Sequence, residues 1–585
     1  MNRALVALLL CSLLPAQSST RPEIGAKMAE FEFLDIRYLP RSLADFPAAE
    51  AFVLFFSTTT CPLVQRYYPK VDLLAQAYRD RGVQFLSVNV GPEDDIAEMA
   101  TQAIEQEVTV EVVKDHRGEV ASAVGIDRSC GVVLIDGKRR LRYRGRIDRQ
   151  FRYSGVSPQT GREDLKEAIE DFLAGREVSV SETPYEGCKI TSPGRQELAH
   201  PVTYSADVAP LIADHCQVCH HPNGQAPFGL QTYDDVADRA EMIAEVVSQR
   251  RMPPWFGSRS HGNFANQRGL TARQRRTILD WVRTGTPEGD PKDLPPPLEF
   301  EDVGWSIGEP DLVLQMPVEQ KIPATGYVPY RYVIFPYRFK HDTWIESIQI
   351  KPSNPRVVHH ANLAYVSPGE TFRQENLITG IVPGGDAMKL GSGVAAFVPK
   401  GAVLALQCHY VTTGKKEKDR TSIGFRFPRE PVQKKLNLLM GINNRFAIPP
   451  GAHAHEVTAS RTFPVDAIGL GLFSHMHLRG KDMAFRVTRP GGEAETLLII
   501  PNYSFDWQMS YRWEGGTVRF PKGTRFDVTA HFDNTAFNPF NPDPTQTVRF
   551  GPQTYHEMMY GFLFYVAEAE ALNILVDPAT GVQIQ

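Results

Sequence analysis

"AFVLFFS", residues 51–57, is an apolar run that is followed, after three threonines, by Cys61. A run of this kind is typical of a strand buried on both faces of a parallel sheet. A second such run, "VQFLSVNV", lies at residues 83–90, and residues 68–81 between them have apolar side chains at the spacing of an amphipathic helix. Strand and helix therefore alternate, which predicts an α/β domain over residues 20–180.

The N-terminus carries an export signal. Residues 1–19 have one arginine, then an apolar run, then small and polar residues. This is the pattern of a secretory signal peptide, and the run is too short for a stable membrane anchor. We therefore expect a secreted or periplasmic chain without a membrane span. The net charge of −5 gives no reason to expect nucleic acid as a partner.

The central part of the chain has a helical pattern between two boundaries. Residues 181–203 are polar and irregular and are interpreted as a linker. Residues 204–290 carry apolar side chains three and four positions apart, which predicts a small all-α domain. A second linker is expected at 291–324, which begins in a proline-rich acidic stretch.

The C-terminal part changes to short alternating runs separated by Pro, Gly and Asn, such as "AVLALQCHYV" at 402–411 and "TRFDVTAHF" at 524–532. Such runs are typical of all-β structure. The length is sufficient for two β-sandwiches. We place them at 325–432 and 433–585.

"CQVCH" at residues 216–220 is the attachment motif of a c-type haem. The two thiols, Cys216 and Cys219, lie about one helical turn apart and would bond the haem vinyl groups, while His220 would bind the iron. Export agrees with this interpretation, since such haem is attached outside the cytoplasm. A zinc site or a disulfide remains as an alternative, although zinc would need further ligands at a suitable spacing.

The region 204–290 resembles small bacterial cytochrome c domains of the type fused to other redox modules. The resemblance rests on the CxxCH motif and on the later "RRMPPWF" at 250–256. It implies Met252 as the second axial ligand of one haem c. The alternative is that Met252 is an ordinary core methionine.

Histidines recur in the β region in patterns that favour metal binding. His475 and His477 are two positions apart, so one face of a strand would present both. His359 and His360 are adjacent, so they can share a metal only at a strand end or a β-bulge. His409 could complete a site of three imidazoles. Imidazole together with a thioether suits copper better than zinc or calcium.

The order "HH", "HY", "HMHLRGK", "EMM" over roughly 325–585 resembles the copper type II, ascorbate-dependent monooxygenases, the family of peptidylglycine α-hydroxylating monooxygenase and dopamine β-monooxygenase. "PNYSFDWQ" at 501–508 also looks like its bacterial branch. The resemblance implies two copper ions in separate β domains that face a solvent-filled cleft. An electron-transfer copper would be held by His359, His360 and His409, and an O2-activating copper by His475, His477 and Met558.

Departures from that family concern the substrate. The peptide-processing enzyme has an arginine and a tyrosine where Phe473 and Phe562 stand here, so peptidylglycine amidation is not expected. Two phenylalanines favour a more apolar substrate, or they belong to the core. Met558 is preferred to Met559 as the ligand because the acidic residue, Glu557, directly precedes it.

The α/β domain resembles the thioredoxin-like redoxins, the peroxiredoxin and thiol-oxidoreductase superfamily, over roughly 28–175. Cys61 occupies the first cysteine position, at the expected start of a helix that favours a thiolate. Val64 replaces the second cysteine, and Cys130 occupies the position of the usual cis-proline. The resemblance leads to the hypothesis of a Cys61–Cys130 disulfide, with Cys188 as the alternative partner. A redoxin fold that serves only for docking is equally compatible with the sequence.

These expectations combine into an exported, multidomain oxidoreductase: a thioredoxin-like α/β domain, a cytochrome c-like domain and two β-sandwiches of the copper monooxygenase type. It would hydroxylate a C–H bond of a small organic substrate with O2. Electrons would come through the fused haem, from ascorbate or from a redox protein. The alternatives are a haem and copper protein for electron transfer or peroxide handling that hydroxylates nothing, and a copper-binding or docking module without turnover.

Overall fold

The computed structural model describes residues 21–116, 118–157, 161–191, 201–222, 224, 226–298, 300, 304–382 and 385–584. The expected signal peptide lies outside the described residues. The chain divides into two compact units. The first comprises residues 1–94 and 102–195, and the second comprises residues 95–101 and 196–585. Within the described ranges, we find no helix that combines the length and the apolarity needed to cross a membrane.

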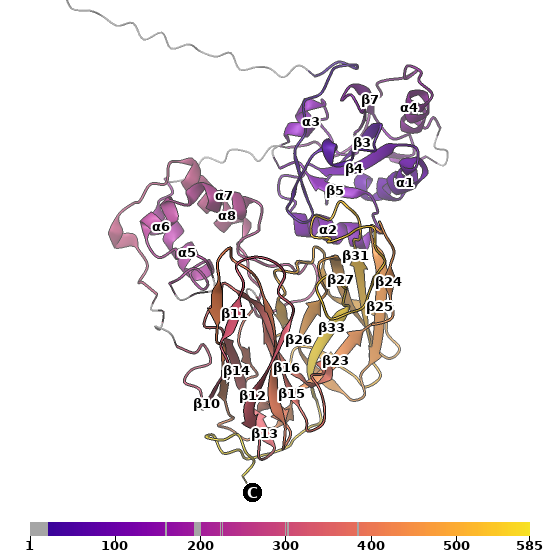
Figure 1. Cartoon of the computed structure of the whole chain (residues 1–585). Helices are drawn as coiled ribbons and strands as arrows, with labels where there is room; N and C mark the ends of the chain where they lie inside the picture. Colours follow the sequence, from indigo (N-terminus) through magenta and orange to yellow (C-terminus); the bar gives the residue numbers. More distant parts are fainter. Residues whose placement is uncertain are drawn as a thin grey trace, which may run out of the picture. The chain divides into compact units, whose positions relative to one another are not determined.

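The first unit is built on a seven-stranded sheet with the order β2-β1-β5-β4-β3-β6-β7. Figure 1 labels β3, β4, β5 and β7 of this sheet. Its interior strand β3 (Ala51–Ser57) is buried along its whole length and pairs in parallel with β4 (Val83–Asn89). The other elements are β1 (Phe33–Asp35), β2 (Pro40–Arg41), α1 (Pro62–Arg79), β5 (Glu111–Lys114), α3 (Glu119–Ala123), β6 (Val132–Asp136), β7 (Leu141–Gly145), β8 (Phe151–Arg152), β9 (Gly155–Val156) and α4 (Asp164–Leu173). Helix α2 (Ile96–Glu105) begins in residues of the second unit and ends in residues of the first. The α/β prediction is confirmed, because the apolar runs form the buried strands.

The expected linker 181–203 begins later than the sequence indicates. Thr183 is buried and its hydroxyl is 2.7 Å from the Tyr143 hydroxyl. Further along, Lys189 forms a β-bridge with Arg128. Backbone hydrogen bonds thus hold residues 182–190 on the α/β unit although their side chains are mostly polar.

The helical part of the second unit packs around Trp281, which is fully buried. Its elements are the π-helical turn η2 (Tyr204–Val208), α5 (Ala209–His215), α6 (Tyr233–Ala237), α7 (Ala240–Ser248) and α8 (Ala272–Arg283). The segment between α7 and α8 differs from the expectation. Trp255 and Phe264 pack into the second β core, where both contact Tyr511, so the region 204–290 is not one closed helical domain.

The first β region has its core between two four-stranded sheets, β10-β21-β14-β17 and β12-β19-β15-β16. The strands are β10 (Leu312–Gln315), β11 (Gln320–Ile322), β12 (Arg331–Arg338), β13 (Thr343–Ile345), β14 (Ser347–Lys351), β15 (Val358–Val366), β16 (Leu377–Ile381), β17 (Met388–Lys389), β18 (Val394–Val398), β19 (Val403–Tyr410), β20 (Glu417–Asp419), β21 (Ser422–Arg426) and β22 (Lys434–Lys435). The expected linker 291–324 is too long, because β10 pairs with β21 and β11 with β20.

The second β region has its core between a sheet with the path β23-β33-β26-β29 and a sheet with the order β25-β31-β27-β28. The strands are β23 (Asn437–Ile442), β24 (Ala447–Ile448), β25 (His455–Thr462), β26 (Ala467–His475), β27 (Gly480–Thr488), β28 (Ala494–Ile500), β29 (Ser510–Arg512), β30 (Arg519–Phe520), β31 (Arg525–Phe532), β32 (Val548–Arg549) and β33 (Tyr560–Ala567). The all-β prediction is confirmed. The boundary 433–585 is not, because Ile574 and Val582 form β-bridges with Val432 and Thr343 of the first region.

Candidate functional sites

Three histidines of the first β region converge on one point. His359 and His360 lie on β15 and His409 lies on the neighbouring strand β19, opposite His360. The register shifts between Val358 and His360, so His359 is the extra residue of a β-bulge. The bulge turns both adjacent histidines to one side, and ligand atoms of the three lie within 4.8 Å of one another.

In His359 and His360, Nε2 has a hydrogen-bond partner outside the cluster, and the Nδ1 atoms face each other. His359 Nε2 is 3.0 Å from Asp506 Oδ1, and His360 Nε2 is 3.2 Å from the Tyr330 hydroxyl. The Nδ1 atoms of His359 and His360 are 3.2 Å apart, and the buried Nδ1 of His409 has no hydrogen-bond partner. Burial lowers the pKa of His360 well below its usual value and that of His409 to about 3. His360 and His409 are therefore neutral imidazoles near pH 7, the form that binds a metal.

A second cluster forms where β26 ends. His475 is the last residue of β26, and the His477 ring centroid lies 5.1 Å from its own. His475 Nδ1 is 2.6 Å from Gln508 Oε1, and His477 Nδ1 is 3.2 Å from the carbonyl oxygen of His556. In both rings Nε2 is therefore left for another partner. Nε2 of His477 is buried and has no hydrogen-bond partner. Burial lowers the pKa of His475 to about 4.

Glu557 ties this cluster together. Its carboxylate accepts hydrogen bonds from the backbone N–H groups of His477 (2.8 Å), Arg479 (2.7 Å) and Met558 (3.2 Å). The carboxylate is fully buried, and burial raises its pKa to about 8. One side chain thereby sets the position of a histidine and a methionine that are 81 positions apart in sequence.

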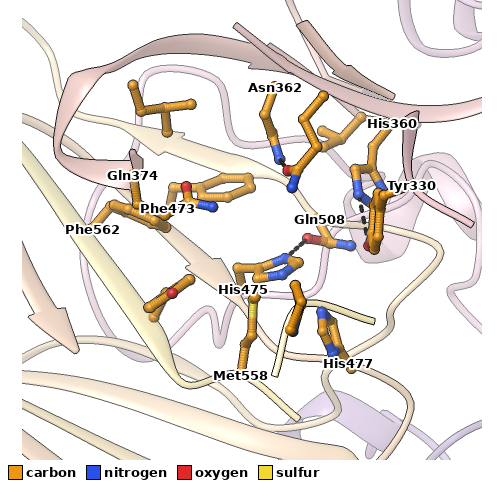
Figure 2. A pocket seen from close by; sticks show the side chains of 15 residues that line it. Tyr330, His360, Asn362, Gln374, Phe473, His475, His477, Gln508, Met558 and Phe562 are labelled. Atoms are coloured by element: carbon orange, nitrogen blue, oxygen red, sulfur yellow. Dashed lines mark hydrogen bonds between the residues drawn. The ribbon is translucent and has the colours of Figure 1, made fainter. Parts of the chain in front are cut away.

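A small cavity of about 30 Å³ lies beside this cluster. Figure 2 shows Met558 among the side chains around it, near His475 and His477, with Phe473 and Phe562 further along the wall. Met559, by contrast, is packed in the apolar core. The cavity has room for about one water molecule, so an organic substrate can enter only after side chains move.

The two histidine clusters are neighbours. The ring centroids of His360 and His475 are 6.2 Å apart, and both rings border the same cavity. Phe505 stacks on His359 at 5.2 Å and lies 6.0 Å from His477, so it contacts both clusters. The resemblance implied two sites that face a solvent-filled cleft; in this structure side chains fill the space between them.

The sequence assigns no role to four residues that contact these histidines: Tyr330, Phe505, Asp506 and Gln508. Phe505, Asp506 and Gln508 lie in "PNYSFDWQ", whose only signal in the sequence is its resemblance to the monooxygenase family. For Glu557, the sequence indicates only that it precedes the ligand candidate Met558. Nothing in the sequence pairs Tyr330 with His360, because 29 residues separate them and the contact depends on the packing of β12 against neighbouring strands.

The CxxCH segment follows α5, with Cys216 as the C-cap residue of that helix. His220 Nδ1 is 3.1 Å from the carbonyl oxygen of Phe228, which leaves Nε2 for a metal. Burial raises the pKa of Cys216 to about 12, so this thiol is not activated by its surroundings. Met252 follows α7, where its N–H donates to the carbonyl of Val246. Its role as an axial ligand stays a prediction.

The α/β unit brings Cys61, Cys130 and Cys188 together as free thiols. Cys61 is the N-cap residue of α1. The pKa of Cys61 is lowered to about 4, chiefly because the Cys130 thiol donates a hydrogen bond to it. Hydrogen bonds from the Ser129 hydroxyl (3.2 Å), the Cys188 thiol and the backbone N–H of Val64 lower it further, against the effect of burial. Cys61 is therefore a thiolate at neutral pH.

This sheet, with a helix that begins at an activated cysteine, defines the α/β unit as a thioredoxin-like redoxin domain. Residues 24–144 match the model of the AhpC/TSA family. No curated protein matches the chain.

Among solved structures, a hypothetical protein of Sinorhizobium meliloti 1021 is 24% identical, with 30% of this chain and 98% of that chain covered and a TM-score of 0.28. An uncharacterized conserved protein of Geobacillus kaustophilus is 26% identical, with 30% and 95% covered and a TM-score of 0.27. The thioredoxin domain of a thiol-disulfide oxidoreductase of Bacteroides vulgatus is 15% identical, with 26% and 99% covered and a TM-score of 0.21.

Proposed function

We propose that the protein is an exported copper-dependent monooxygenase that converts a C–H bond of a small organic substrate into C–OH. The overall reaction consumes O2, two electrons and two protons and releases one water. The observation that carries the proposal is the pair of ligand clusters, one on each β region, which share a cavity and contain buried imidazole nitrogens without partners.

The residues present fit copper. His359, His360 and His409 would hold one ion through Nδ1, because Asp506 and the Tyr330 hydroxyl are bonded to Nε2 of the first two rings. The set of His475, His477 and Met558 would hold the other through two Nε2 atoms and a thioether sulfur. Copper bound in these sites would supply one-electron chemistry between Cu(I) and Cu(II).

The remaining side chains position and select. Gln508 and the carbonyl of His556 orient the two imidazoles of the second set. Phe473 and Phe562, whose ring centroids are 5.8 Å apart, give the cavity an apolar wall and no charge to pair with a carboxylate. The proposed substrate is therefore a small apolar molecule.

A haem c bound to Cys216 and Cys219 is the proposed internal reductant, with His220 as one axial ligand and Met252 as the other. The hydrogen bond from His220 Nδ1 to Phe228 supports it, since this contact leaves Nε2 for iron. Ascorbate or a redox protein would reduce the enzyme directly or through the haem. A tethered reductant acts at a high effective concentration.

The test uses the full chain, produced in a host that attaches haem c and then loaded with copper. The reduced protein is mixed with O2, and haem absorbance is followed with and without copper. Fast reoxidation that requires copper and is lost in His475→Ala supports the proposal, with the exposed His341→Ala as the matched control. Reoxidation indifferent to copper and to His475 would remove the haem from the electron path.

Copper content separates the remaining alternatives. We expect two ions per chain and the loss of one in His409→Ala. Labelled O2 with candidate apolar substrates then tests for C–OH formation. Two bound coppers without labelled product would favour an electron-transfer or peroxide-handling protein.

A further inference from the structure

The three thiols of the α/β unit differ in how far they reach the surface. Cys61 is fully buried and Cys130 is 2% exposed, whereas Cys188 is partly exposed. The Tyr153 hydroxyl lies within hydrogen-bonding reach of Cys188, and this side chain is itself 61% exposed. A molecule from solution therefore meets Cys188 first.

Cys188 is held beside Cys61 by the segment that follows α4. The N–H of Cys188 donates to the Ser129 hydroxyl (3.0 Å), and the same hydroxyl donates to Cys61 Sγ (3.2 Å). The N–H of Ser129 donates to the Cys188 carbonyl (2.8 Å). Gly187 lies so close that an added Cβ would be 1.7 Å from the carbonyl oxygen of Ser129. These contacts hold Cys188 next to Cys61, and the Cys188 thiol donates a hydrogen bond to the Cys61 thiolate.

Cys130 is held by strand β3. Its N–H donates to the carbonyl of Phe56 on β3 (2.7 Å), and its φ is +61°. The thiol of Cys130 is the largest contribution to the lowered pKa of Cys61. Its own pKa is raised, mainly by this hydrogen bond and by burial. Cys130 thus stays protonated and stabilises the Cys61 thiolate.

We propose that Cys61 and Cys188 form the redox-active disulfide of this domain, and that Cys188 is the sulfur that exchanges with outside dithiols. The substrate class is a dithiol, or the corresponding disulfide, in a small molecule or in an exposed loop of a protein. This assignment is independent of the copper and haem sites. It selects the partner that the sequence left as the alternative to Cys130.

The exchange between the domain and an outside dithiol proceeds in two steps. A thiolate of the outside dithiol attacks Cys188 Sγ, the Cys61–Cys188 bond breaks, and Cys61 leaves as a thiolate. The second thiol of the outside molecule, deprotonated, then attacks the mixed disulfide and displaces Cys188, which takes up a proton. Two electrons pass from the outside dithiol to the domain, and one proton goes to solvent. The reverse sequence oxidises the domain with an outside disulfide.

Chemistry favours this order of attack. Thiol–disulfide exchange is faster at an accessible sulfur and when the departing thiol has a low pKa. Attack at Cys188 meets both conditions, because Cys61 is the departing sulfur. Attack at Cys61 would meet neither. Cys130 therefore serves as a positioning residue that keeps the leaving thiolate stable.

The test uses the full chain and dithiodipyridine as the probe disulfide, with every cysteine followed by mass spectrometry. After treatment with dithiodipyridine, we expect the wild-type protein to yield a disulfide-linked Cys61–Cys188 peptide. Cys61→Ser should retain a stable pyridyl adduct on Cys188. In Cys188→Ser, dithiodipyridine should react with Cys61 at least about tenfold more slowly than it reacts with Cys188 in Cys61→Ser, since Cys61 is buried. Cys408→Ser, which removes a buried thiol of the β region, is the matched control.

Two results would overturn the proposal. One is a disulfide-linked Cys61–Cys130 peptide in the wild-type protein, a result that depends on no variant. The other is an adduct at Cys188 that forms no faster than one at buried Cys408. Cys130→Ala, which removes the donor to Cys61, should still form the Cys61–Cys188 disulfide, but dithiothreitol should reduce it more slowly. Unchanged thermal unfolding verifies that each variant is folded.

Discussion

Gln508→Leu tests whether His475, His477 and Met558 bind a metal and whether Gln508 orients His475 for this role. Gln508 is 2% exposed, and its Oε1 accepts a hydrogen bond of 2.6 Å from His475 Nδ1. Leucine has a similar volume but no acceptor, so the buried N–H of His475 loses its partner. A lost partner of this kind costs about 1–3 kcal/mol of unfolding free energy. At about 2–4 °C per kcal/mol, Tm should fall by roughly 2–12 °C.

The effect on copper is separate from the effect on stability. Removal of a residue that orients a metal-binding histidine lowers metal affinity about 10–100-fold. We expect that loss for one of the two coppers, measured by competition with a Cu(I) chelator, and no change for the copper held by His359, His360 and His409. Gln508→Glu keeps the acceptor atom and should retain most of the affinity.

Gln407→Leu is the matched control. Gln407 lines the same cavity and is 5% exposed, but its amide bonds to Asn362 (3.1 Å) and the Tyr332 hydroxyl (2.7 Å) and to no histidine. It should lower Tm without lowering copper affinity. Equal affinity losses in the two leucine variants, or none in Gln508→Leu, would refute the role assigned to Gln508.

Three further predictions concern other parts of the chain. Absorbance of the thiolate should titrate at Cys61 near pH 4, with thiolate above and thiol below this pH, and a midpoint near the ordinary cysteine value would contradict the contacts described. Arg479→Met should lower the unfolding free energy by about 1–3 kcal/mol in a denaturant titration, because Arg479 is 2% exposed and the Asn534 side chain and the Tyr555 carbonyl lose the hydrogen bonds that it donates. Gly187→Ala should cost about 1–3 kcal/mol by overpacking against Ser129 and should slow formation of the domain's disulfide on non-reducing peptide maps; wild-type behaviour in both assays would mean that this segment yields easily.

Local pattern was sufficient for the fold classes. The run at 51–57 is apolar at nearly every position and is shorter than a typical helix, so it predicts a strand covered on both faces, which is β3 in the structure. Alternation in the C-terminal half predicts β structure for the same reason, since one face of each strand meets a core. Domain boundaries were less predictable. The chain returns from Ile574 to Val432 through a β-bridge, and no local composition marks such a contact.

For the candidate sites, too, the sequence predicted the ligand residues but not the contacts that orient them. Residue type and spacing in the sequence singled out His359, His360 and His475 as ligand candidates, because imidazoles at such spacings are good chelators. The bulge that turns His359 and His360 to one side, and the acceptor that orients His475, depend on strand register and on a loop more than 30 residues away. Tertiary structure alone decides those contacts, since they arise from elements that meet only after the chain has folded.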